Sequence, residues 1–144
     1  MNRIFIAVLM TLATITTTHA HDDHGPKRHD APKYGGRVAI AVSKDSREHL
    51  YKGELTRTQS DTVRLYLYDD HMNPLSLDGF ENKATATLSF KKQKAKLNTV
   101  FSLQKEGKAF VGKMPQISQK PFTIEVHIKE GPREWVIRFP NLDH

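Results

Sequence analysis

Histidine and aspartate are the residues of this chain whose types and spacing suggest chemistry. Seven of the eight histidines follow Ala20, and the first three lie in a short segment with three aspartates: His21, His24, His29, Asp22, Asp23 and Asp30. Imidazole nitrogen and carboxylate oxygen are ligands that suit Cu(II), Zn(II) and Ni(II). Because the chain contains no cysteine, a metal site would have to use these donors. The composition therefore predicts a divalent transition metal (Cu, Zn or Ni) as a bound ion.

The position of His21 adds a second argument. Cleavage after Ala20 would make His21 the first residue, so that its α-amine and its ring nitrogen could chelate one ion together, with His24 as a third donor. The spacing contains no fixed-interval metal motif such as His-Glu-x-x-His. The alternative is a soluble leader without a metal role.

Two later histidines are further candidate ligands. His71 stands in the segment Asp69–Pro74 beside Asp70 and Met72, where a loop at a strand end could close a site with His49 or with the first three histidines. A polar connection with a proline turn is the alternative for this segment. His127 falls on the polar face of a predicted strand and is predicted to be a surface residue. The predicted metal ligands are His21, His24, His29, His49 and His71.

Other function classes find little support in the residues. The chain has no Gly-x-Ser-x-Gly motif, no cysteine nucleophile and no phosphate-binding loop, which argues against an enzyme. Lysine and arginine total 22 against 16 aspartate and glutamate residues, but the only dense basic cluster, 91–96, is predicted to be a hairpin tip. Without interleaved aromatic residues or a recognition helix, we do not expect nucleic-acid binding.

The N-terminus has the three parts of an export signal. Arg3 is the positive charge, residues 4–12 are apolar, and 18–20 offer small residues where a signal peptidase reads. The apolar run is shorter than the roughly 20 residues that a membrane helix needs, so no membrane span is expected. We predict a signal peptide over 1–20, cleaved near Ala20, and, for a small domain without cysteine, a bacterial periplasmic location.

Alternation of apolar and polar residues predicts the fold. It is clearest in 61–69, 84–91 and 121–130, and weaker strands are expected at 37–42, 50–57, 97–103, 109–113 and 134–139. Turn residues separate them, including Glu106-Gly107 and Gly131-Pro132. This pattern predicts an all-β domain over 34–144: an immunoglobulin-like antiparallel β-sandwich of about 7–8 strands, with a closed barrel as the alternative. Residues 21–33, which are poor in apolar side chains, are predicted to be a flexible tail.

The outer face of the 61–69 strand suggests a function without metal. Arg64, Tyr66 and Tyr68 would share that face, and aromatic and arginine side chains are enriched at protein interfaces. The chain could then be a metal-independent protein-interaction module. A loop that covers Tyr66 and Tyr68 is the alternative.

Several short stretches together resemble a poorly characterised group of small periplasmic proteins: 34–38, 48–50, 61–70, Asn73-Pro74 and 84–88. These proteins have a histidine-rich leader, a Gly-Gly pair, and a strand that ends in aspartate before a proline turn. The resemblance implies association with tripartite, proton-driven heavy-metal efflux systems. Tyr34 stands where a histidine is expected before Gly-Gly. The resemblance and the histidines together predict a periplasmic metal-binding accessory or buffer protein, with an efflux component as its partner.

Overall fold

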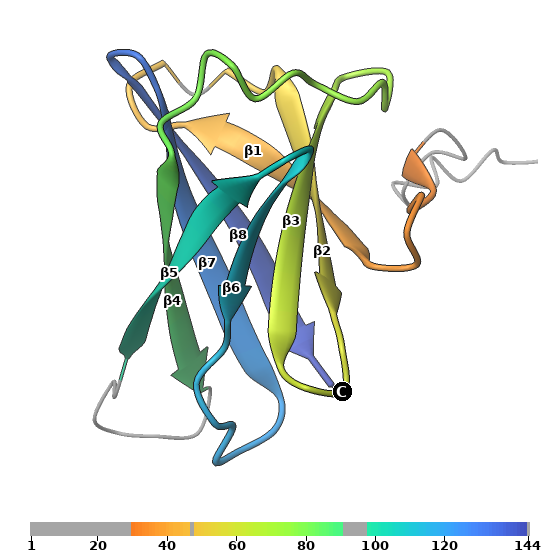
Figure 1. Cartoon of the computed structure of the whole chain (residues 1–144), viewed down its shortest axis with the longest axis vertical. Helices are drawn as coiled ribbons and strands as arrows, with labels where there is room; N and C mark the ends of the chain where they lie inside the picture. Colours follow the sequence, from red (N-terminus) through yellow and green to blue (C-terminus); the bar gives the residue numbers. More distant parts are fainter. Residues whose placement is uncertain (1–29, 47, 91–97, 144) are drawn as a thin grey trace, which may run out of the picture.

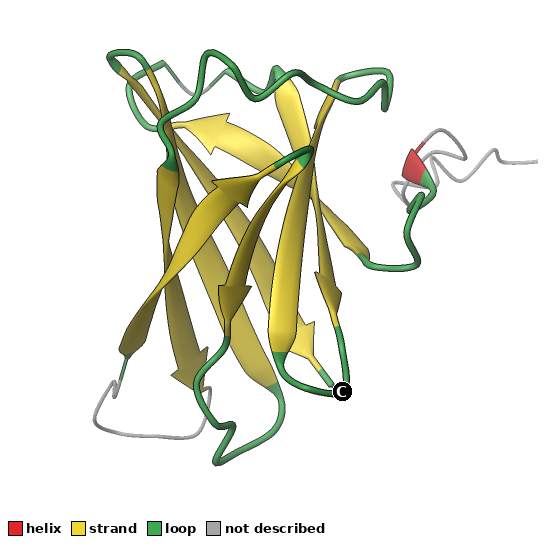
Figure 2. Ribbon diagram, in the orientation of Figure 1, coloured by secondary structure: helices red, strands yellow, loops and turns green. Residues whose placement is uncertain are grey.

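Eight β-strands make up the domain in the computed structural model, which describes residues 30–46, 48–90 and 98–143 (Figures 1 and 2). The strands are β1 (Arg37–Ser43), β2 (Tyr51–Arg57), β3 (Thr62–Asp69), β4 (Lys83–Phe90), β5 (Thr99–Glu106), β6 (Ala109–Lys113), β7 (Phe122–Glu130) and β8 (Arg133–Leu142). Each predicted strand has its counterpart here, so the all-β prediction is confirmed. The predicted hairpin tip at 91–96 lies outside the described residues.

The strands form one closed antiparallel barrel in the order β1-β2-β3-β6-β5-β4-β7-β8. The prediction of an immunoglobulin-like sandwich is therefore wrong. β8 pairs with β1, with Ala41 opposite Ile137, and this last pairing removes the open edges that a sandwich would keep. Alternation could not distinguish the two folds, because strands in both have one inward and one outward face.

The interior of the barrel is filled by the inward-facing side chains. Those with almost no exposed surface include Trp135, Phe110, Phe122, Phe139, Leu65 and Leu103. Burying a large apolar side chain contributes roughly 1.5–3 kcal/mol, so these residues supply the main driving force for folding. β6 approaches β5 so closely that a Cβ at Gly112 would lie 2.3 Å from the Ser102 carbonyl oxygen. Only glycine allows this contact. Because apolar side chains fill the interior, the polar groups that could bind a ligand lie on the outer wall and at the ends of the barrel.

Two loops meet at one end of the barrel, because Tyr51 at the start of β2 pairs with Asp69 at the end of β3. The 44–50 loop leads into β2, and the 70–82 loop leaves β3 (top of Figure 1). We call this the histidine end, since His49 and His71 lie in these loops. No helix in the described part of the chain is long and apolar enough to cross a membrane.

Candidate functional site

A segment before β1 lies against the outer wall of the barrel; we call this segment, Asp30–Gly36, the strap. Its backbone N–H groups at Lys33, Tyr34 and Gly36 donate hydrogen bonds of 2.9, 2.8 and 2.8 Å to the carboxylate of Glu54. Successive backbone N–H groups that converge in this way form an anion-binding concavity. Residues 30–33, assigned to the flexible tail on sequence, therefore include groups that contact the barrel.

Glu54 lies on the outward face of β2, yet its exposed fraction is 0%. The Tyr68 hydroxyl donates a fourth hydrogen bond, of 2.8 Å, to the same carboxylate. Burial alone would raise the pKa of Glu54, but the bonds from the Gly36 N–H, Tyr68 and the other strap amides outweigh it and hold the pKa below its ordinary value of 4.5. The carboxylate is therefore charged at neutral pH and fixes the strap to β2.

The first residue of the strap is tied to the histidine end. The Lys52 ammonium donates to Asp30 Oδ1 and to the Asp70 carbonyl oxygen, each at 2.7 Å. The bond to Asp30 raises the pKa of Lys52 above its ordinary value, against the opposing effect of burial. One cation thus joins Asp30, which follows the histidine-rich segment (residues 21–29) in the sequence, to the loop that carries His71.

The predicted metal ligands are only partly placed. His21, His24 and His29 lie outside the described residues. His49 and His71 are both exposed at the histidine end, but across 30–46, 48–90 and 98–143 no three histidine, aspartate or glutamate side chains are gathered closely enough to hold a metal ion. The described residues at this end therefore contain no complete set of ligands.

Asp69 organises the loop around His71. Its Oδ1 accepts hydrogen bonds from the backbone N–H of His71 and of Asn73, at 2.9 and 2.8 Å, and its Oδ2 accepts one from the Asn73 amide. The bond from the Asn73 side chain contributes most to a pKa of Asp69 below its ordinary value. Asp69 is thus engaged in the loop, while the Asp70 carboxylate, largely exposed, faces solvent 3.5 Å from Lys52.

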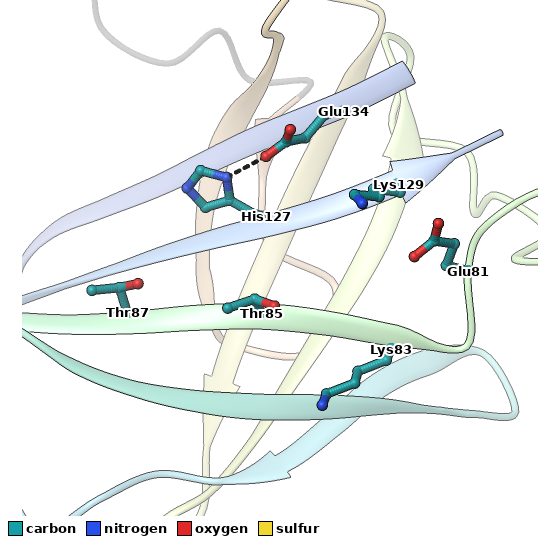
Figure 3. A pocket seen from close by; sticks show the side chains of 7 residues that line it. All are labelled: Glu81, Lys83, Thr85, Thr87, His127, Lys129 and Glu134. Carbon is teal, nitrogen blue, oxygen red and sulfur yellow. Dashed lines mark hydrogen bonds and ion pairs between the residues drawn. The ribbon is translucent and has the colours of Figure 1, made fainter. Parts of the chain in front are cut away.

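His127 lies on the opposite wall of the barrel, in a shallow groove of about 420 Å³ over β4, β7 and β8 (Figure 3). Its Nδ1 lies 2.7 Å from Glu134 Oε1, and its Nε2 lies 3.0 Å from Glu125 Oε1. Burial opposes protonation, but the two carboxylates outweigh it and raise the pKa of His127 above 6.5. The two carboxylates face opposite edges of the imidazole ring, so the three groups do not converge on one ion. They form an ion-pair bridge between β7 and β8.

The strap, β3 and the turn between β5 and β6 together form an aromatic and basic surface. The rings of Tyr34 and Tyr66 stack with their centroids 4.0 Å apart and an interplanar angle of 17°. Together with Arg64 and Lys108 they line a hollow of about 310 Å³. We call these four residues the aromatic–basic surface. Tyr68, placed on this face by alternation, is only 1% exposed, because the strap covers it.

Sequence reasoning did not identify Lys52, Glu54 or Glu134. The Gly35-Gly36 pair was the one signal for the strap, since Gly35 takes a φ of +73° and a Cβ at Gly36 would lie 2.4 Å from the Leu55 carbonyl oxygen. In comparisons with known proteins, no family model, no curated protein and no solved structure matches the chain.

Proposed function

We propose that this chain is an exported, periplasmic protein that binds a divalent transition metal and acts as a metal buffer or as an accessory of a metal efflux pump, without catalysis. The ligands would come from the histidine-rich segment and from the histidine end of the barrel. The candidate residues are His21, His24, His29, His49 and His71.

The bridge through Lys52 is the observation that carries this proposal. A flexible histidine segment alone would bear the full entropic cost of ordering when it binds an ion. Here Asp30 is held at 2.7 Å by the lysine that also holds the Asp70 carbonyl. Because His29 precedes Asp30 directly, the segment starts beside the loop that carries His71. A site that joins the two sets of imidazoles would then bear a smaller ordering cost.

The loop that carries His71 supports the same proposal. Its two hydrogen bonds from backbone N–H groups to Asp69 hold it in a defined shape, so His71 would be presented from a preformed turn. The exposed Asp70 carboxylate stands next to it as an oxygen donor. Imidazoles bind a metal ion in their neutral form, so binding is expected to weaken in acid.

Calorimetric titration tests the proposal directly. The chain that begins at His21 is titrated with Cu(II), Zn(II) and Ni(II) at pH 7, and one ion is expected to bind far more tightly than the roughly millimolar level that scattered surface histidines would give. Replacing His21, His24 and His29 together with serine should abolish this binding, and His71→Ala should weaken it about tenfold. His127→Ala is the matched control and should leave it unchanged. Binding that is no tighter than millimolar, or that survives the triple replacement, would contradict the proposal.

Export and association with an efflux pump are tested by separate experiments. Export predicts that mass spectrometry of the secreted form finds His21 as its first residue. The pump association rests on the resemblance to small periplasmic proteins of heavy-metal efflux systems, and it predicts co-purification with a periplasmic efflux component in the presence of the metal. A form processed beyond His24 would lack the amino-terminal chelate.

A further inference from the structure

The stacked pair of Tyr34 and Tyr66 is the most exposed aromatic feature of the described wall. Tyr34 is 56% exposed, although its backbone N–H is fixed to Glu54 at 2.8 Å. One face of its ring packs on Tyr66, and more than half of the residue's surface is open to solvent. An aromatic ring that is both exposed and held in place loses little conformational entropy when a partner packs on it.

The groups around this pair are mainly basic. Arg64 and Lys108 line the same hollow with one acid, Glu106, and the Lys33 ammonium lies 5.6 Å from the centre of the Tyr68 ring next to it. Within the hollow, two positive charges thus face one negative charge, in a chain of net charge +6. Tyrosine and arginine are among the residues most enriched where protein partners bind tightly.

The register of the wall brings together the residues that line the hollow. β3 pairs with β6, so that Tyr66 stands opposite Ala109 and Arg64 stands opposite Val111. Ala109 and Val111 line the hollow of about 310 Å³ together with the tyrosine pair. An extended segment could lie there with an apolar side chain on the rings and carboxylates beside Arg64 and Lys108.

We propose that the aromatic–basic surface, Tyr34, Tyr66, Arg64 and Lys108, is a docking site for an acidic segment of a partner protein, and that the strap assembles it. Charge complementarity selects the acidic partner, since the surface has a net positive charge. The strap is required because it supplies Tyr34, and Glu54 holds that residue over Tyr66. This binding does not depend on the metal, so it can be tested separately in the presence of a chelator.

The probe is a fluorescein-labelled peptide in which glutamates flank one phenylalanine, and its binding is followed by fluorescence anisotropy at low salt with EDTA. Tyr34→Ala and Arg64→Gln should each weaken the affinity by about fivefold or more, the effect typical of residues at the centre of an interface. Gly36→Ala should do the same although Tyr34 is still present, because its Cβ would meet the Leu55 carbonyl oxygen at 2.4 Å.

Lys129→Gln is the matched control, because it removes one positive charge from β7 on the far side of the barrel. It should change the affinity by less than about twofold, as expected for a remote charge. Circular dichroism of each variant at 25 °C establishes that the barrel is intact. The proposal is overturned if Lys129→Gln weakens binding as much as Arg64→Gln does, or if the peptide does not bind. It is also overturned if alginate, an anionic polysaccharide, binds more tightly than the peptide with the same dependence on Tyr34.

Discussion

Replacing Glu54 with glutamine should release the strap while leaving the barrel folded. Oε1 of Glu54 accepts the N–H groups of Tyr34 and Gly36, and Oε2 accepts the Lys33 N–H and the Tyr68 hydroxyl. The oxygen of the new side-chain amide can keep the bonds from the Tyr34 and Gly36 N–H groups. The Tyr68 hydroxyl can rotate to accept a bond from the new NH₂ group. The Lys33 N–H then faces another donor and loses its bond.

The magnitude follows from that count of bonds. Leaving one buried donor without an acceptor costs about 1–3 kcal/mol, and the remaining bonds lose the strength that a charged acceptor gives them. Because the released strap amides can bond to water, the total loss of free energy is limited. We expect the attachment of the strap to the barrel to weaken by about 2 kcal/mol, which is roughly a thirtyfold change in the equilibrium between the attached and the released strap. Glu81→Gln is the control, because this exposed glutamate undergoes the same chemical change without a role in the strap.

Amide hydrogen exchange measured by NMR is the assay. Protection of the N–H groups of Lys33, Tyr34 and Gly36 should fall about thirtyfold in Glu54→Gln, while that of Leu65 in β3 should not change. Unchanged protection at the three strap amides would refute the reasoning, and so would an equal loss throughout the barrel. The pH dependence has a definite sign. Because the pKa of Glu54 lies below 4.5, its contribution is complete above that pH and is lost as the pH falls through the lowered pKa.

The remaining predictions concern the opposite wall, the core and the histidine end. His127→Gln should lower the free energy of unfolding by about 0.5 kcal/mol at pH 6, a small value because the surrounding groups are partly solvated. Since the pKa of His127 is raised above 6.5, the difference should vanish as the pH rises through it, and an equal difference at pH 6 and pH 10 in urea unfolding would contradict the ion-pair bridge. Gly112→Ala should lower the free energy of unfolding by about 2 kcal/mol or more, because the new Cβ meets the Ser102 carbonyl oxygen at 2.3 Å; wild-type thermal stability would refute this contact. Lys52→Met should weaken metal binding about tenfold without changing the stability of the barrel core, and calorimetry that finds equal affinity would show that the anchor of Asp30 is not needed.

The strands could be predicted from the sequence because alternation is a local signal. Val63, Leu65 and Leu67 point inward in the structure as their spacing requires, and each leaves less than 3% of its surface exposed. Closure into a barrel could not be predicted, because it depends on the pairing of β1 with β8 at opposite ends of the domain. A β-sandwich and a barrel would place the same residues inside.

The outer wall was harder to predict because its contacts link distant residues. Alternation assigns Glu54 and Tyr68 to solvent, and they are buried only because a segment 18 to 21 residues before Glu54 folds back over them. Glu134 is different, since it follows His127 by seven residues across the Gly131-Pro132 turn. The register of the hairpin places Glu134 opposite Lys129 and diagonally next to His127, so the turn residues are the local sequence signal for this pair.

Paramagnetic NMR with Cu(II) tests the central proposal most directly. One equivalent of Cu(II) is added to the isotope-labelled chain that begins at His21, and broadening of backbone amide signals shows which residues lie close to the ion. Metal binding at the histidine end predicts that the signals of Asp30, Asp70 and His71 disappear, while that of Lys113, which pairs with Thr62 at the opposite end of the barrel, stays sharp. Broadening around Lys113 instead, or sharp signals for all three residues at the histidine end, would contradict it.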